Sequence, residues 1–174
     1  MSTETEKLII EFGRREHPLG RVIKAKEVPK LIEALRQRLG CSVEELDLSP
    51  ESLKRLELRL IALHQAVQEG QVPMDDEETM RLMREVTAYL GQVMVVNLDG
   101  EWEERIPTLW PSMIKVPLPV ETIKGKEVHV SSGRGFVAAH TAAYFWDLIG
   151  TGEERGYLPR QYEMMTKKRW RERL

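Results

Sequence analysis

A glycine-rich loop at residues 131–135 is the best candidate in this sequence for an anion site. The loop Ser131-Ser132-Gly133-Arg134-Gly135 directly precedes a strongly apolar segment with helical character. Backbone N–H groups at a helix N-terminus attract anions, and Arg134 could close over a phosphate or carboxylate. The loop has neither the Gly-Lys-Ser/Thr of a P-loop nor the G-x-G-x-x-G of a dinucleotide-binding turn. A serine-capped turn is therefore the favoured interpretation, and a ligand site is the alternative.

His140, Tyr144 and Asp147 could form a polar cluster on one face of the helix that follows. His140 and Tyr144 are four residues apart, a spacing that places two side chains on the same helix face. Such a histidine could act as a general base. No serine or cysteine nucleophile is identifiably coupled to it, so hydrogen bonding within the core is the favoured interpretation. We expect no catalytic residues, and the predicted ligand-binding residues are Ser131, Ser132, Arg134, His140 and Tyr144.

The histidines and the single cysteine do not predict a metal or cofactor site. Histidines stand at positions 17, 64, 129 and 140, without H-x-x-x-H or C-x-x-C spacing. Cys41 is the only cysteine, so no intramolecular disulfide can form, and a reducing compartment is expected. We expect no metal and no cofactor.

Two segments could contact a partner. Trp110 stands between Pro107 and Pro111, and an exposed tryptophan in such a stiff loop could anchor a partner protein, although packing over the sheet is favoured. The basic C-terminal run of residues 167–173 contains Arg169 and Trp170, which could contact nucleic acid by phosphate pairing and stacking. A basic final helix turn is the favoured interpretation, because the chain as a whole has a net charge of −2.

Composition predicts one soluble globular domain over residues 1–174, with residues 1–6 and 171–174 flexible. The hydrophobic content is 41% and the charged content 31%. The net charge of −2 gives no overall drive toward nucleic acid or membrane. The N-terminus lacks the features of a secretory signal, and the most apolar run, residues 136–149, is shorter than the roughly 20 residues that cross a bilayer. We expect a cytoplasmic location and no contact with a membrane.

Apolar residues recur at helical spacing in five segments. The first is Val28–Leu39, ended by Gly40, and the second begins at Ser49-Pro50-Glu51 and ends at Gly70. The third begins at Asp75–Glu78 and is expected to end at Gly91. The last two are a buried helix over about 136–149 and a C-terminal amphipathic helix over about Pro159–Trp170.

The apolar run Val93–Val96 and the dipeptide Asp99-Gly100 predict a β-hairpin, because both turn residues tolerate positive φ. Other predicted strands are Leu8–Phe12 with Arg21–Lys24, Met113–Val116 as an edge strand or extended passage between prolines, and Glu127–Val130. The predicted fold is a single α+β domain with N-terminal helices, a small, mostly antiparallel sheet and two C-terminal helices.

Three short motifs resemble a loosely defined group of uncharacterised bacterial proteins. They are Ser49-Pro50-Glu51-Ser52-Leu53 at the start of a leucine-rich helix, Ala88-Tyr89-Leu90-Gly91 at the end of the next, and Gly100-Glu101-Trp102 after a strand. Proteins of that group share a core in which a helix is followed by the sequence AYLG, then by a strand, and then by the sequence GEW. The resemblance covers residues 45–105 and implies a bacterial cytoplasmic protein without an assigned activity.

The sequence contains no convergent set of catalytic residues. We therefore expect a non-enzymatic protein-binding or regulatory domain that acts through an unknown protein partner or through self-association. The alternative is a binder of a small anionic molecule, or an enzyme, with a pocket near residues 131–144. Nucleic-acid contact through the C-terminal run is the third and least favoured interpretation.

Overall fold

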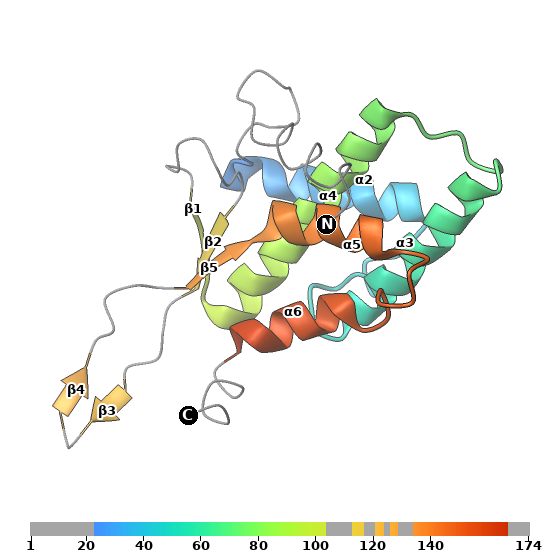
Figure 1. Ribbon diagram of the computed structural model, residues 1–174. Coiled ribbons are helices and arrows are strands. Elements are labelled where there is room, and N and C mark those ends of the chain that lie inside the picture. The colour runs from blue at the N-terminus through green and yellow to red at the C-terminus, as the bar shows by residue number, and fades with distance from the viewer. Residues whose placement is uncertain (1–22, 104–112, 117–120, 124–125, 129–133, 167–174) are drawn as a thin grey trace.

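The computed structural model describes residues 23–103, 113–116, 121–123, 126–128 and 134–166, and in this part of the chain it is mainly helical (Figure 1). The 3₁₀-helix η1 spans Ala25–Glu27. The α-helices are α2 (Val28–Leu39), α3 (Ser52–Gln68), α4 (Asp76–Leu98), α5 (Ala138–Leu148) and α6 (Tyr157–Met165). The strands are β1 (Glu101–Glu103), β2 (Met113–Val116), β3 (Glu121–Ile123), β4 (Lys126–Val128) and β5 (Arg134–Val137).

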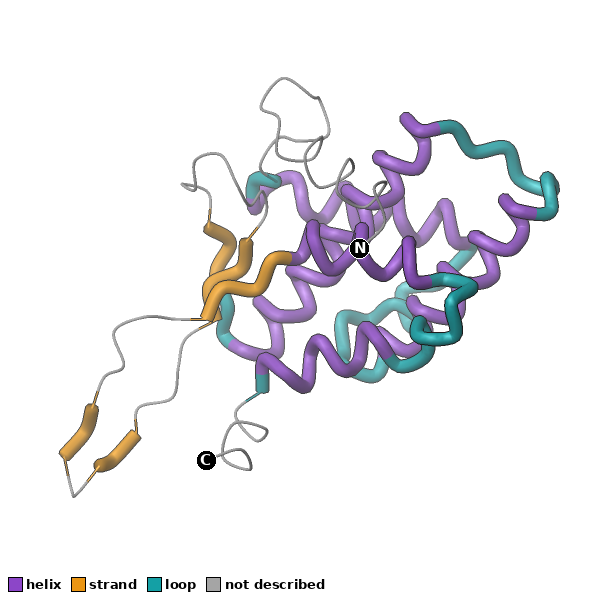
Figure 2. The backbone as a smooth tube through the Cα atoms, in the orientation of Figure 1, coloured by secondary structure: helices purple, strands orange, loops and turns teal. Residues whose placement is uncertain are grey.

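The predicted α+β fold is wrong, because helices dominate the described residues and each strand has only three or four residues (Figure 2). β1, β2 and β5 lie side by side in the order β1-β2-β5, with antiparallel pairing, at one end of the helices. β3 and β4 pair with each other as a separate two-stranded ladder. The core is therefore a helical one, and it is built around α4.

Helix α4 continues beyond the glycine at which it was expected to end. The prediction that the carboxylates after residue 74 begin this helix is confirmed, because the Asp75 side chain accepts a hydrogen bond from the Glu78 N–H at 2.8 Å. The prediction of a helix end at Gly91 is wrong. Val93 and Met94 were predicted to lie in a strand, but they belong to the continuing helix and are buried there.

The predicted hairpin at Asp99-Gly100 is also wrong. Asp99 has the expected positive φ of 52°, but it uses this conformation as the C-cap of α4. β1 then pairs with β2, with Trp102 opposite Ile114, and residues 93–98 are not its partner. β2 was expected at an edge because of the neighbouring prolines, yet it is the middle strand. All of those prolines lie outside the four residues of β2, so each of its N–H groups is retained.

Gly91 has a packing role in the middle of α4. A Cβ atom at this position would lie 2.6 Å from Trp102 Cζ2 and 2.9 Å from Ile114 Cδ1, closer than carbon atoms approach one another. The Trp102 indole therefore lies directly against the α4 backbone, and its Nε1–H donates to Gln92 Oε1 at 3.2 Å. The missing side chain at Gly91 is what allows β1 and β2 to pack on the helix.

The N-terminal half of the core is fixed to α4 by two polar contacts. Arg38 of α2 donates from Nε to Glu85 Oε2 at 2.9 Å, and from Nη1 to Glu78 Oε2 at 2.8 Å. The buried Tyr89 hydroxyl accepts from the Leu48 N–H at 3.1 Å and donates to Ser52 Oγ at 2.5 Å. The Arg38 contacts hold α2 on α4, and the Tyr89 contacts hold the loop before α3 and the first residue of α3 against α4.

The other predicted elements agree in part with the structure. The bounds of α2 are confirmed, and Gly40 ends it with a φ of 61°. α3 begins at Ser52, two residues later than the expected first helical residue, Pro50, while α5 begins at residue 138 because residues 134–137 form β5. The first predicted hairpin falls almost wholly in residues 1–22, outside the described residues; Ile23 and Lys24 are described and form no strand.

The Gly91–Trp102 contact predicts a non-additive pair of substitutions. Gly91→Ala forces the indole to move, at a cost of about 1–3 kcal/mol from overpacking. Alanine is more favourable than glycine in a helix interior by about 1 kcal/mol, so this gain offsets part of the cost. The free energy of unfolding should therefore fall by up to about 2 kcal/mol. In a Trp102→Leu background the same substitution should be neutral or stabilising. Equal effects of Gly91→Ala in the two backgrounds, measured by urea unfolding, would contradict the contact.

Candidate functional site

A cleft lies between α5 and α6, and the loop that joins these helices shapes it. Three glycines in this loop have positive φ, namely Gly150 at 91°, Gly152 at 88° and Gly156 at 72°. Glycine adopts this region without the steric cost that a Cβ brings. The chain can therefore reverse within a few residues after α5, and α6 returns beside it (Figure 1).

A buried carboxylate from α3 holds the start of α6. Glu57 is 3% exposed, and it accepts hydrogen bonds from the Gly156 N–H at 2.5 Å and the Leu158 N–H at 3.1 Å. Amide groups at a helix start have no partner within the helix, and the helix dipole favours a negative charge there. Glu57 thus accepts hydrogen bonds from two such amides and fixes α6 on α3, although the bonded residues are about 100 positions apart in the sequence.

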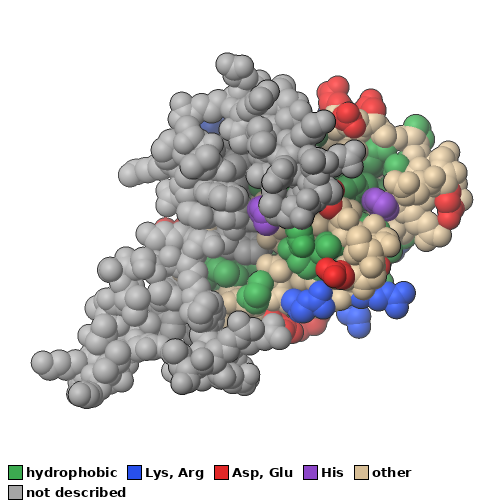
Figure 3. Space-filling model, in the orientation of Figure 1, with side chains coloured by type: hydrophobic (Ala, Val, Ile, Leu, Met, Phe, Trp, Pro, Cys, Tyr) green, Lys and Arg blue, Asp and Glu red, His purple; other side chains and the backbone are tan. Residues whose placement is uncertain are grey.

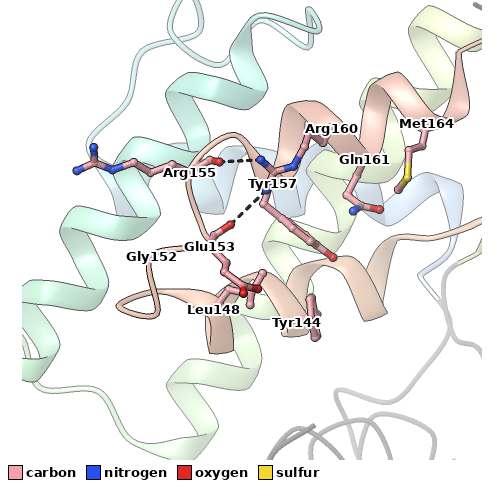
Figure 4. Close-up of a pocket in the computed structure, with 9 residues that line it drawn as sticks. All are labelled: Tyr144, Leu148, Gly152, Glu153, Arg155, Tyr157, Arg160, Gln161 and Met164. Carbon is pink, nitrogen blue, oxygen red and sulfur yellow. Dashed lines mark hydrogen bonds between the residues drawn. The ribbon is translucent and has the colours of Figure 1, made fainter. Parts of the chain in front are cut away.

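The cleft has a volume of about 450 Å³. Figure 4 shows that the Tyr157, Gln161 and Met164 side chains project from α6 toward α5, where Tyr144 and Leu148 form the opposite wall. The residues that line it are Tyr144, Leu148, Gly152, Glu153, Arg155, Tyr157, Arg160, Gln161 and Met164. This volume lies within the range of common ligand sites.

Aromatic rings form the inner wall of the cleft. The rings of Tyr144 and Tyr157 have centroids 5.6 Å apart and are tilted by 45°, and Phe145 stacks on Tyr157 at 6.0 Å. Burial raises the pKa of Tyr157 to about 12, so its hydroxyl is a neutral hydrogen-bonding group at physiological pH. Leu148 is 8% exposed at the base, whereas Met164 is 43% exposed at the opening.

Charged side chains surround the opening of the cleft. Arg160 donates from Nη1 to the Arg155 carbonyl at 3.1 Å and from Nη2 to the Glu153 carbonyl at 3.2 Å. Within the described residues, neither Arg155 nor Arg160 forms an ion pair with a carboxylate, and Glu153 is the one acidic residue of the lining. Figure 3 shows hydrophobic side chains on this face of α5 and α6, bordered by basic and acidic ones.

Behind the cleft, α5 contacts α3 through an aromatic pair. The His64 imidazole meets the Trp146 indole edge-on, with ring centroids 4.8 Å apart. Burial lowers the pKa of His64, and the nearby Asp147 carboxylate opposes this shift. Folding therefore favours the neutral imidazole at this position relative to the unfolded chain.

One of the predicted ligand-binding residues lies in the cleft. Tyr144 is part of its wall, while His140 lies one turn earlier on α5 and stacks on Tyr144 with a centroid distance of 6.0 Å. Arg134 is the first residue of β5. Ser131 and Ser132, together with the predicted partner-binding residues Trp110, Arg169 and Trp170, lie outside the described residues.

The α6 side of the cleft was missed, although the sequence contains a signal for it. Tyr157, Arg160, Gln161 and Met164 follow the spacing of one helix face directly after a glycine-rich turn. Glu57 was missed as well, although it stands four residues after Leu53 and three before Leu60, on the apolar side of α3. A charge within an apolar helical stripe indicates a specific buried partner.

The described part of the chain contains no cluster of three or more His, Cys, Asp or Glu side chains suited to a metal ion. Among the described helices, none combines the length and the apolar character that crossing a bilayer requires. Comparison of the chain with protein-family models, with curated proteins and with solved structures gave no match.

The lowered pKa of His64 predicts that acid weakens the fold. The unfolded chain binds a proton at His64 near pH 6.5, whereas the folded chain binds it only at lower pH. Because the unfolded state then holds more protons, the free energy of unfolding falls as the pH drops through this range. His64→Gln should make the dependence of this free energy on pH shallower between neutral and mildly acidic pH. An unchanged slope would contradict the burial of this side chain.

Proposed function

We propose that this chain is a non-enzymatic protein-binding domain and that the α5–α6 cleft is its binding surface. The observation that carries the proposal is the combination, around one open cleft, of an aromatic wall, an exposed methionine and two arginines that have no carboxylate partner among the described residues. Aromatic residues, methionine and arginine are the types most enriched at protein interfaces.

The open shape of the cleft supports a protein partner over a small molecule. Gly152, Glu153, Arg155, Arg160 and Met164 are all exposed, so a small ligand would remain in contact with solvent along that side. Small-molecule sites usually bury most of their ligand, whereas a protein segment can continue across an open cleft. Methionine also adapts its shape to different partners.

The residue types of the lining favour binding over catalysis. The described residues around the cleft include no serine, cysteine, histidine or aspartate. A nucleophile coupled to a base would need such groups within hydrogen-bonding distance. A small anionic molecule held by Arg160 is the alternative occupant, since the guanidinium has donors beyond the two that bind carbonyl groups.

Capture from a lysate of the source cells tests the proposal with two matched variants. Met164→Asp places a charge at the opening of the cleft, and Leu58→Asp places one at a side chain of α3 that is 58% exposed and outside the cleft. Wild-type protein and Leu58→Asp should retain the same partner, which Met164→Asp should lose. Sedimentation velocity of the wild type shows in parallel whether the partner is a second copy.

Two results would contradict the proposal. One is a partner held equally by all three proteins, which would exclude the cleft. The other is the absence of both a captured protein and self-association. Thermal unfolding of the variants serves as the control, because both substituted side chains are exposed and neither change should lower the melting temperature by more than a few degrees.

A further inference from the structure

We infer that the cleft receives a short segment of the partner in which an acidic residue stands beside an aromatic or aliphatic one. This inference rests on the function proposed above and adds the chemical class of the bound segment. It follows from the charge at the opening of the cleft, the fixed position of one arginine and the apolar wall.

The charges at the opening favour an acidic partner. Arg155 and Arg160 contribute two positive charges to the lining, and Glu153 contributes one negative charge. Other arginines of the helical core, such as Arg38 and Arg81, form ion pairs with carboxylates. The two cleft arginines form no ion pair within the described residues, so both guanidinium groups can receive a carboxylate from a partner.

Arg160 is positioned to receive a carboxylate. Its two bonds to the Arg155 and Glu153 carbonyls hold the guanidinium against the loop between α5 and α6 (Figure 4). A guanidinium has five N–H donors in a planar fork, so three remain for a ligand. Since the group is already ordered, binding a carboxylate there costs little side-chain entropy. Arg155 extends from the rim away from the tyrosines and acts over a longer range (Figure 4).

The wall beside Arg160 favours an apolar neighbour to that carboxylate. Tyr157 is one turn before Arg160 on α6, and the positive charge of Arg160 acts on its hydroxyl. The Tyr157 and Tyr144 rings and the Met164 thioether offer an aromatic and adaptable surface at this position. A segment with an acidic and an apolar side chain in sequence can occupy both features at once.

Glu153 argues against a nucleic acid in the cleft. Its carboxylate would face a phosphate backbone that carries a charge on every nucleotide, whereas a peptide needs to place only one or two carboxylates near Arg160. The net charge of the chain, −2, gives no compensating attraction.

The test is an NMR titration of the full chain, labelled with ¹⁵N, with three matched peptides. The first is Ac-Gly-Leu-Glu-Glu-Phe-Leu-Gly-NH₂, and in the other two both glutamates are replaced by glutamine or by lysine. The acidic peptide should shift the amides of α5 and α6 and bind roughly two- to fivefold more tightly than the glutamine peptide. Raised salt should reduce this difference, and the lysine peptide should bind weakest of the three.

Two arginine variants and one lysine control test whether the cleft arginines cause the preference for the acidic peptide. Arg160→Gln should weaken the acidic peptide by roughly two- to fivefold and leave the glutamine peptide unchanged. Arg155 contributes only its backbone carbonyl to the contact with Arg160, so Arg155→Gln leaves that contact in place. This variant should weaken binding of the acidic peptide by up to about twofold, and it remains a test if Arg160→Gln disturbs α6. Lys30→Gln removes one exposed positive charge from α2, outside the cleft, and should have no effect.

Each contrary outcome has a distinct meaning. Equal affinity for the three peptides, or shifts outside α5 and α6, would overturn the acidic class of partner. Tighter binding of 3-phenylpropanoate or of a thymidine oligonucleotide than of the acidic peptide would assign the cleft to a small carboxylate or to nucleic acid, and would overturn the inference. The proposed function fails separately, if Met164→Asp retains the captured partner.

Discussion

The cleft depends on one interaction, the buried carboxylate of Glu57 at the N-terminus of α6. Its two oxygens bind the amides of Gly156 and Leu158, which otherwise have no partner within the helix. A buried charge without such donors would cost several kcal/mol, so the carboxylate and the helix end stabilise each other. α6 has nine residues and one fully buried side chain, Leu158, while Tyr157, Tyr162 and Met165 are partly buried against the core. The contact with Glu57 fixes the first turn of α6, and thereby the outer wall of the cleft, on α3.

The inner wall depends on α4, which supports both ends of the fold. α2 and α5 both pack on α4, and Tyr89 and Arg38 link it to the loop before α3 and to α2. Glu57 then connects α3 to α6. The outer wall of the cleft, α6, is thus connected to α4 through α3. The inner wall, α5, packs on α4 directly. The small group of strands packs at the far end of α4, where Gly91 leaves space for Trp102.

The helix bounds that depend on local signals could be predicted from the sequence. α2 has an apolar stripe, a proline near its start and a glycine with positive φ at its end, and these local preferences agree with its packing. The start of α4 could be predicted in the same way, but its continuation past Gly91 could not, because Val93–Val96 has strong strand propensity and Gly91 has the character of a helix stop. Burial of Val93 and Met94 and the contact with Trp102 override those preferences. The cleft was missed for a related reason. Its position is fixed by the contact between Glu57 and Gly156, which lie 99 residues apart, and the spacing of nearby residues cannot predict so distant a contact.

Hydrogen exchange of individual amides, followed by NMR in the full chain, tests this account most directly. In the wild type, the Gly156 and Leu158 amides should be protected, because both donate to Glu57. In Glu57→Gln their protection should fall by roughly tenfold or more, since a hydrogen bond to a charged group is replaced by one to a neutral amide. The amide of Leu35, in the buried centre of α2, should serve as an unchanged reference. Exchange of Gly156 and Leu158 at the rate of an unfolded peptide in the wild type would contradict the docking of α6, and with it the cleft.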